Sequence, residues 1–126
     1  MNRHFVLISA AISGFLSVAI GAFAAHALRG QLDSRALEIF ATAHDYHISH
    51  SLLLLFIGLF MLENSTKKLQ LSATFILIGL LLFSGSLYLL AVSGIRWLGM
   101  ITPLGGIFLL AGWLLLVLGF VSTRKA

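Results

Sequence analysis

The sequence predicts an all-α integral membrane protein, an antiparallel four-helix bundle with a short interfacial helical segment before the second helix. Of the 126 residues, 60% are hydrophobic and only 10% are charged. A soluble domain of this size could not cover so much apolar surface with so few charges. Four apolar runs approach the roughly 20 residues that a spanning helix needs. We expect one domain over residues 1–126, with spans at about 5–25, 46–62, 71–92 and 103–121.

The first run follows a basic start and contains small-residue sites like those that end a secretory signal peptide. Its apolar stretch is longer than the usual signal core, and its small residues recur at helical spacing. We therefore expect it to be retained as the first span.

The second helix is expected to start outside the hydrocarbon. Gly30 can end the helix before it, and Asp33 or Ser34 can cap the new one. The chain then enters the bilayer near Tyr46, so the residues before that point form the interfacial segment.

The third and fourth spans are joined by the apolar segment 94–101, which is too short to cross a membrane. Gly94 can end the third helix, and Trp97 can anchor the segment at the interface. Thr102 followed by Pro103 is a suitable N-cap and first-turn pair for the fourth helix.

Small residues recur at a seven-residue spacing in these helices. Lipid provides no hydrophobic drive for helix association, so close backbone approach has to supply it. A seven-residue repeat keeps one face toward a neighbour in a left-handed bundle. The glycines expected at helix contacts are Gly14, Gly21, Gly58, Gly79, Gly105, Gly112 and Gly119.

Positive charges near the span ends predict the orientation. With four spans, both termini and the 63–70 loop share one side, which carries five Lys and Arg against three on the other. The positive-inside rule then places both termini in the cytoplasm, in the plasma (bacterial inner) membrane. The basic residues are scattered at helix ends, so nucleic acid is not an expected partner. The expected partners are the lipid bilayer and either a second copy or another membrane protein.

Residues 43–51 read AHDYHISHS and place three histidines at the mouth of the second span. On a helical wheel His44, His47 and His50 fall at about 0°, 300° and 240°. An ionisable side chain inside a membrane is costly and indicates a functional site. Polar residues gather in the same, non-cytoplasmic half of the protein. The expected polar or ligand cluster comprises His26, His47, His50, Ser51, Ser86, Tyr88, Arg96 and Thr102.

Three interpretations of this cluster remain open. Neutral histidines and serines can form hydrogen bonds between helices. Imidazole also suits zinc, copper and haem iron, so His26, His47 and His50 could bind a metal ion or haem, with His44 or Asp45 nearby. Histidine titrates near neutrality, which would suit a proton- or pH-responsive site. Cysteine is absent, and no nucleophile–base set or paired carboxylates are found, so an enzymatic role is not favoured.

His26 ends the first span and His50 begins the buried part of the second. Because antiparallel neighbours joined by one outer segment bring such ends to similar depth, we expect these two histidines to lie near one another. They would need hydrogen-bonding company, since a buried imidazole requires a partner.

Four stretches of the sequence are similar to a known family: GAFAAHAL at 21–28, FATAHDYHISHSLLLL at 40–55, LFSGSLYLLAVSG at 82–94 and ITPLGGIFLLAGW at 101–113. The chain resembles the small four-span membrane proteins of domain of unknown function 423, which include YgdD-like and transmembrane protein 256-like proteins. The resemblance implies the architecture and a membrane location, and it carries no activity. The positions that match the family pattern are His26, His50, Ser51, Ser84, Gly85, Tyr88, Thr102, Pro103, Gly105 and Gly106.

His44 and His47 depart from that pattern, and many bacterial members have glutamine at the position of His47. The resemblance therefore makes His26 and His50 the better metal candidates. We expect a small, non-enzymatic membrane protein that acts by helix association, as a small subunit, an assembly factor or a homo-oligomer. The alternative is an outer-side histidine pocket that binds a metal ion, haem or a proton.

Overall fold

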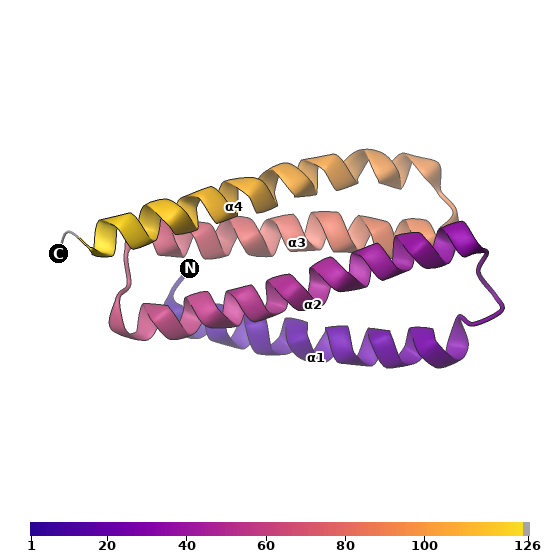
Figure 1. Cartoon of the computed structure of the whole chain (residues 1–126), viewed down its shortest axis with the longest axis horizontal. Coiled ribbons are helices and arrows are strands. Elements are labelled where there is room, and N and C mark those ends of the chain that lie inside the picture. Colours follow the sequence, from indigo (N-terminus) through magenta and orange to yellow (C-terminus); the bar gives the residue numbers. More distant parts are fainter. Residues whose placement is uncertain (125–126) are drawn as a thin grey trace.

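Four α-helices run back and forth along the long axis of the molecule (Figure 1). The structure is a computed structural model and describes residues 1–124. Each α-helix is long and apolar enough to cross a membrane, so the predicted fold class is confirmed. The elements are α1 (Arg3–Ala27), α2 (Ser34–Glu63), α3 (Lys67–Ser93), the 3-10 helix η1 (Arg96–Met100) and α4 (Ile101–Thr123).

The ends of α1, α2 and α3 follow from local chemistry. The Asp33 side chain accepts a hydrogen bond from the Ala36 backbone N–H at 2.7 Å and so caps α2. Gly94 ends α3 in the left-handed region, with φ 70°. Gly30 also has a positive φ of 80°, but α1 has already ended at Ala27. Gly30 therefore turns the chain within the loop and does not end the helix.

The start of α4 differs from the sequence prediction. Its N-cap position is Met100, which makes no side-chain cap bond, because α4 continues directly from η1. Thr102 is already inside the helix, and its hydroxyl lies 2.7 Å from that of Ser86 on α3. The prediction that Thr102 caps α4 is therefore wrong, although Pro103 does lie in the first turn.

The interfacial segment expected before the second span is continuous with it. At 1.5 Å per residue, the 30 residues of α2 make a helix about 45 Å long, which exceeds a hydrocarbon thickness of about 30 Å. The length of α2 is therefore sufficient for the expected interfacial turns in addition to a span. Trp97 of η1 is 60% exposed at the same end of the molecule, as an interfacial anchor would be.

The helices lie side by side in chain order. Extensive contacts join α1 to α2, α2 to α3 and α3 to α4. Figure 1 shows α1 and α4 at opposite edges of the molecule. The largest buried cluster draws on all four helices and includes Leu54, Ile57 and Ile76. Outward-facing residues such as Phe15 and Leu110 are 74% and 72% exposed, as expected for side chains that face lipid.

The start of α1 and the end of α4 lie at the end of the bundle that holds the α2–α3 loop (Figure 1). The Arg3 guanidinium donates to the Leu62 carbonyl oxygen at 3.3 Å. The Lys68 ammonium donates to the Ser122 hydroxyl at 2.8 Å. These bonds join the start of α1 to the end of α2, and the start of α3 to the end of α4.

Glycines permit the closest approach in the bundle, which is that of α3 and α4. A Cβ built at Gly105 would lie 2.8 Å from Phe83 Cα, and one at Gly79 would lie 2.8 Å from the backbone N of Leu109. A side chain at either position would push the two backbones apart. A built Cβ would also lie under 3.0 Å from a neighbouring helix at Gly21, Gly58, Gly112 and Gly119.

Gly14 differs from the other six glycines that were expected at helix contacts. A Cβ built there would meet nothing within 4 Å. The buried residues of α1 are Val6, Ala10, Ser13 and Ser17, and Gly14 lies beside this line. Since α2 is the only extensive neighbour of α1, the expected contact at Gly14 is absent from the described structure.

Candidate functional site

The first two histidines of α2 reach different neighbouring helices. The His44 Nε2–H donates to the backbone carbonyl oxygen of Ser17 on α1 at 3.0 Å. His47 Nδ1 lies 3.0 Å from the hydroxyl of Tyr88 on α3, and the two rings meet edge to face at 74°. His47 is buried, with 8% of its surface exposed. The two imidazoles thus tie α2 to α1 and to α3.

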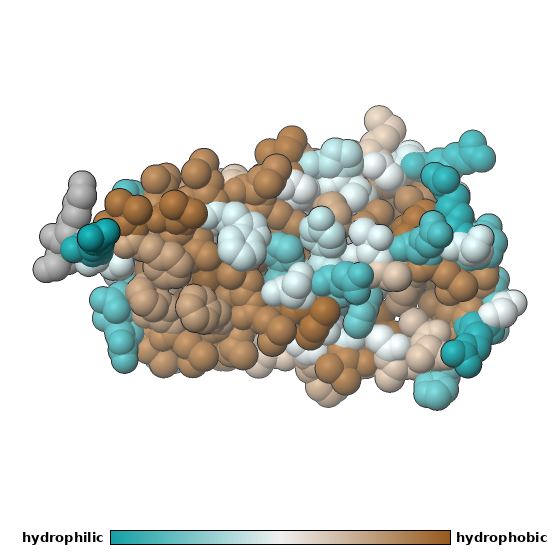
Figure 2. Space-filling view, viewed as in Figure 1, coloured by the Kyte–Doolittle hydropathy of each residue, from teal (hydrophilic) through white to brown (hydrophobic). Residues whose placement is uncertain are grey.

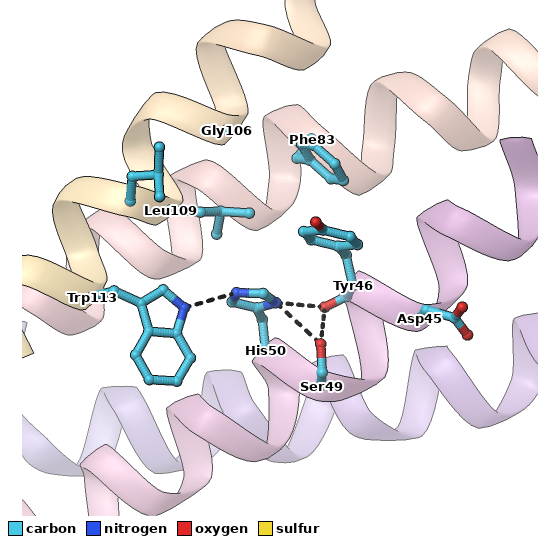
Figure 3. A pocket seen from close by; sticks show the side chains of 9 residues that line it. Asp45, Tyr46, Ser49, His50, Phe83, Gly106, Leu109 and Trp113 are labelled. Carbon is cyan, nitrogen blue, oxygen red and sulfur yellow. Dashed lines mark hydrogen bonds between the residues drawn. The ribbon is translucent and has the colours of Figure 1, made fainter.

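The third histidine reaches α4. The indole Nε1–H of Trp113 donates to His50 Nε2 at 3.2 Å, and His50 Nδ1 lies 2.9 Å from the backbone carbonyl oxygen of Tyr46 (Figure 3). An indole N–H can only donate and a carbonyl can only accept. His50 is therefore a neutral imidazole with its proton on Nδ1, and both of its ring nitrogens are engaged.

The spacing of the three histidines explains why each finds a different partner. Each step of three residues turns by about 300° around the helix axis, so the three side chains spread over about 120° of α2. We call His44, His47 and His50 the histidine fan. The three side chains therefore point in different directions from α2. His44 bonds to α1, His47 to α3 and His50 to α4, so the fan bonds to every other helix.

Serines add further bonds between helices. Ser51 donates to the backbone oxygen of His47 at 2.7 Å, so its one proton is used. The Ser13 hydroxyl of α1, at 2.6 Å, must then donate to Ser51. Ser84 donates to the Ala43 carbonyl at 2.8 Å and so joins α3 to α2. Ser51 thus lies in the predicted cluster as a structural link.

The contact of Ser86 with Thr102 pairs two further members of the predicted cluster, and it joins α3 to α4. Ser86 also donates to the Phe83 carbonyl oxygen at 3.0 Å, so Thr102 is the donor in their shared bond. Further toward the α2–α3 loop, Ser72 donates to the Gly112 carbonyl at 2.7 Å. The same two helices are therefore bonded at two depths.

His26 lies outside the cluster. Ser13 is level with Ser51, and His26 follows Ser13 by about three and a half turns of α1, roughly 20 Å. The expectation that His26 and His50 lie near one another is therefore wrong. The reason is that α2 begins at Ser34, about three turns before Tyr46, so the outer end of α1 lies beside those first turns.

Arg96 also lies outside the cluster. It is exposed on η1 and lines a separate surface hollow together with Arg35 of α2. The structure pairs four of the other predicted side chains, His47 with Tyr88 and Ser86 with Thr102, and separates His26 and Arg96 from them. Ser51 bonds to the backbone oxygen of His47 and to Ser13, and His50 pairs with Trp113.

Trp113 was not predicted as a site residue. Its position in the sequence could have indicated a special role. Tryptophan favours the membrane interface, and Trp113 lies in the middle of a span. An indole N–H in the hydrocarbon region has no water to bond and needs an acceptor in the protein. Among the polar groups of neighbouring helices, His50 supplies it.

Side chains that could bind a metal ion do not gather at one place in the described part of the chain. Within residues 1–124, no group of three or more His, Cys, Asp or Glu side chains could hold a metal ion. His50 has no free ring nitrogen, and His26 is remote. The two better metal candidates, His26 and His50, are therefore too far apart to bind one ion together.

A groove of about 660 Å³ runs beside His50 between α2 and α4, with α3 as its floor. Figure 3 shows Trp113, His50, Tyr46 and Asp45 in a row along it. Figure 2 shows hydrophilic and neutral side chains reaching from the α1–α2 loop to the middle of this face, and a hydrophobic surface beyond. The lining residues are Asp45, Tyr46, Ser49, His50, Phe83, Gly106, Leu109, Leu110 and Trp113.

Four hydrophobic helices joined by hydrogen bonds between their buried polar side chains define a multi-pass membrane protein. The chain belongs to the family described as "Protein of unknown function (DUF423)", whose model matches residues 20–106. The resemblance that the sequence indicated is therefore confirmed. No solved structure matches the chain.

Curated relatives extend over nearly the whole chain. The UPF0382 inner membrane protein YgdD of Escherichia coli (strain K12) is 38% identical over 125 residues, which cover 99% of this chain and 95% of the relative. A UPF0382 membrane protein of Haemophilus influenzae is 42% identical over 124 residues, 98% of each chain. Another from Staphylococcus haemolyticus is 38% identical over 120 residues, 94% of each chain. These names place the relatives in membranes and mention no enzymatic activity.

Proposed function

We propose that the protein is a non-enzymatic component of the plasma (bacterial inner) membrane that acts by helix association, with a second copy of the chain as its partner. The observation that carries the proposal is that the histidine fan is engaged in hydrogen bonds between the helices. Each imidazole forms a hydrogen bond that holds helices together, and His50 has both ring nitrogens engaged. The polar cluster thus accounts for the fold, which leaves the lipid-facing surfaces as the functional ones.

The far side of α1 is the surface that we assign to association. This helix lies at an edge of the molecule and packs extensively against α2 alone. Ala11, Phe15, Val18 and Ala22 are exposed on it, at steps of four, three and four residues. Ala11 and Ala22 are small, and the apolar side chains of Phe15 and Val18 lie between them, so a second helix can pack against this side by van der Waals contact.

Both termini belong in the cytoplasm under this proposal. The same end of the bundle holds the start of α1, the end of α4, and Lys67 and Lys68 at the start of α3. The larger number of positive charges at that end supports the assignment through the positive-inside rule.

Disulfide cross-linking tests the association surface, because the chain contains no cysteine. Ala22→Cys places a thiol on the exposed side of α1, and Leu110→Cys places one on the exposed side of α4 as a matched control. Oxidation in native membranes and in liposomes of the purified protein should give a dimer with the first variant and little with the second. Equal yields at both positions, or a product that is not twice the mass of the chain, would contradict self-association through α1.

A further inference from the structure

The groove between α2 and α4 has preformed aromatic walls. The Tyr46 and Phe83 rings lie 4.3 Å apart, the Tyr46 and His50 rings are stacked at 5.6 Å, and His50 meets Trp113 edge to face at 6.2 Å. The hydrogen bonds on both nitrogens of His50 fix this row (Figure 3). The groove therefore needs little ordering of side chains when it binds a ligand.

A carboxylate lies at the rim of this groove. Asp45 is exposed and is the only carboxylate in the lining of the groove. His50 is the only titratable nitrogen base in the lining. Because His50 is held neutral by its two bonds, no cation in the groove wall balances Asp45. The rim thus carries a net negative charge and complements a positively charged group.

The depth of Asp45 identifies where that group comes from. Asp45 lies about 27 Å along α2 from Glu63 at the opposite end of the helix. A hydrocarbon layer is about 30 Å thick, so the carboxylate lies close to its boundary, where phospholipid headgroups begin. Below this level the groove is lined by Leu109 and Leu110, which suit an acyl chain.

The chemistry of the rim favours an ammonium group. A carboxylate pairs with it, and the faces of tyrosine and tryptophan attract cations. The Tyr46 hydroxyl makes no bond to the other side chains drawn in Figure 3, so it can donate to a phosphate or ester oxygen. A headgroup with a net negative charge would instead meet repulsion from Asp45.

We propose that this groove binds one phospholipid with a zwitterionic, ammonium-bearing headgroup. The ammonium lies at Asp45 beside the Tyr46 ring, and one acyl chain follows the groove past Leu109 and Leu110 to Trp113. The site is independent of the association surface on α1, because it is built from α2, α3 and α4.

Tryptophan fluorescence can test this site directly. The chain has two tryptophans, and Trp97→Phe leaves Trp113 as the only one. The protein is reconstituted in vesicles that contain equal fractions of brominated-chain phosphatidylethanolamine, phosphatidylcholine or phosphatidylglycerol, and quenching of Trp113 is measured. From ion-pair and cation–π energies, the zwitterionic lipids should bind about three- to tenfold more tightly than phosphatidylglycerol.

Two variants that each remove one negative charge from α2 distinguish binding in the groove from a general effect of charge on lipid binding. Asp45→Asn should remove the preference for zwitterionic lipids, whereas Glu38→Gln, an exposed carboxylate of α2 outside the groove, should retain it. Far-UV circular dichroism checks that both variants are folded. Equal quenching by all three lipids in the parent would overturn the proposal, and so would a preference that survives Asp45→Asn or disappears in Glu38→Gln.

Discussion

Replacing Gly105 by alanine tests the closest helix contact in the bundle. A Cβ at this position would lie 2.8 Å from Phe83 Cα and 2.9 Å from the carbonyl carbon of Leu82. These are backbone atoms, so no side-chain rotation can relieve the clash and α3 must move away from α4. Overpacking of this kind costs about 1–3 kcal/mol, and the better helix propensity of alanine returns up to about 1 kcal/mol. We expect a net loss of about 1–2 kcal/mol in the free energy of unfolding.

The adjacent glycine provides a matched control. A Cβ at Gly106 would come no closer than 3.9 Å to the Phe83 ring, so the same substitution adds a methyl group without a clash. Gly106→Ala should leave stability unchanged or raise it by up to about 1 kcal/mol. The assay is unfolding of the purified protein in mixed micelles with increasing dodecyl sulfate, followed by far-UV circular dichroism. If Gly105→Ala and Gly106→Ala unfold at the same dodecyl sulfate fraction, then α3 and α4 do not touch at Phe83 and the packing argument fails.

Two further predictions concern the topology and the histidine fan. With single cysteines at Ser34 and Ser65, an impermeant thiol reagent should label the first and spare the second in intact cells; the reverse pattern would invert the orientation. His50→Leu should lower the free energy of unfolding by about 1–3 kcal/mol, because it leaves the indole N–H of α4 without an acceptor, whereas His50→Asn should retain most of the stability. Equal unfolding midpoints for both His50 variants in the same micelle assay would show that this hydrogen bond contributes nothing.

The features that depend on the residues of a single helix could be predicted from the sequence. Apolar run lengths give the four helices, and the cap chemistry of Asp33 and Gly94 gives two of their ends. The seven-residue spacing locates Gly105 and Gly112 at contacts, because a helix with one close neighbour turns the same face toward it along its length. Gly14 departs from this rule because it lies beside the line that α1 buries.

The partners of the histidines could not be predicted in the same way. A helical wheel gives the direction of each imidazole on α2 but not the rotation of the neighbouring helices, so Trp113 was not found as the partner of His50. The depth of His26 was misjudged because the sequence does not give the register of α1 against α2. Ser13 lies level with Ser51, which places His26 beside the first turns of α2.

The histidine fan also sets the order in which the hydrogen bonds between helices can form during synthesis of the chain. The acceptor of His44 is on α1 and already exists when that histidine is made, but His47 needs Tyr88 and His50 needs Trp113. Until those later residues arrive, His47 Nδ1 and His50 Nε2 lack their partners on the later helices, and an unsatisfied polar group in lipid costs several kcal/mol. The first two helices are therefore an incomplete unit until α3 and α4 supply these two partners.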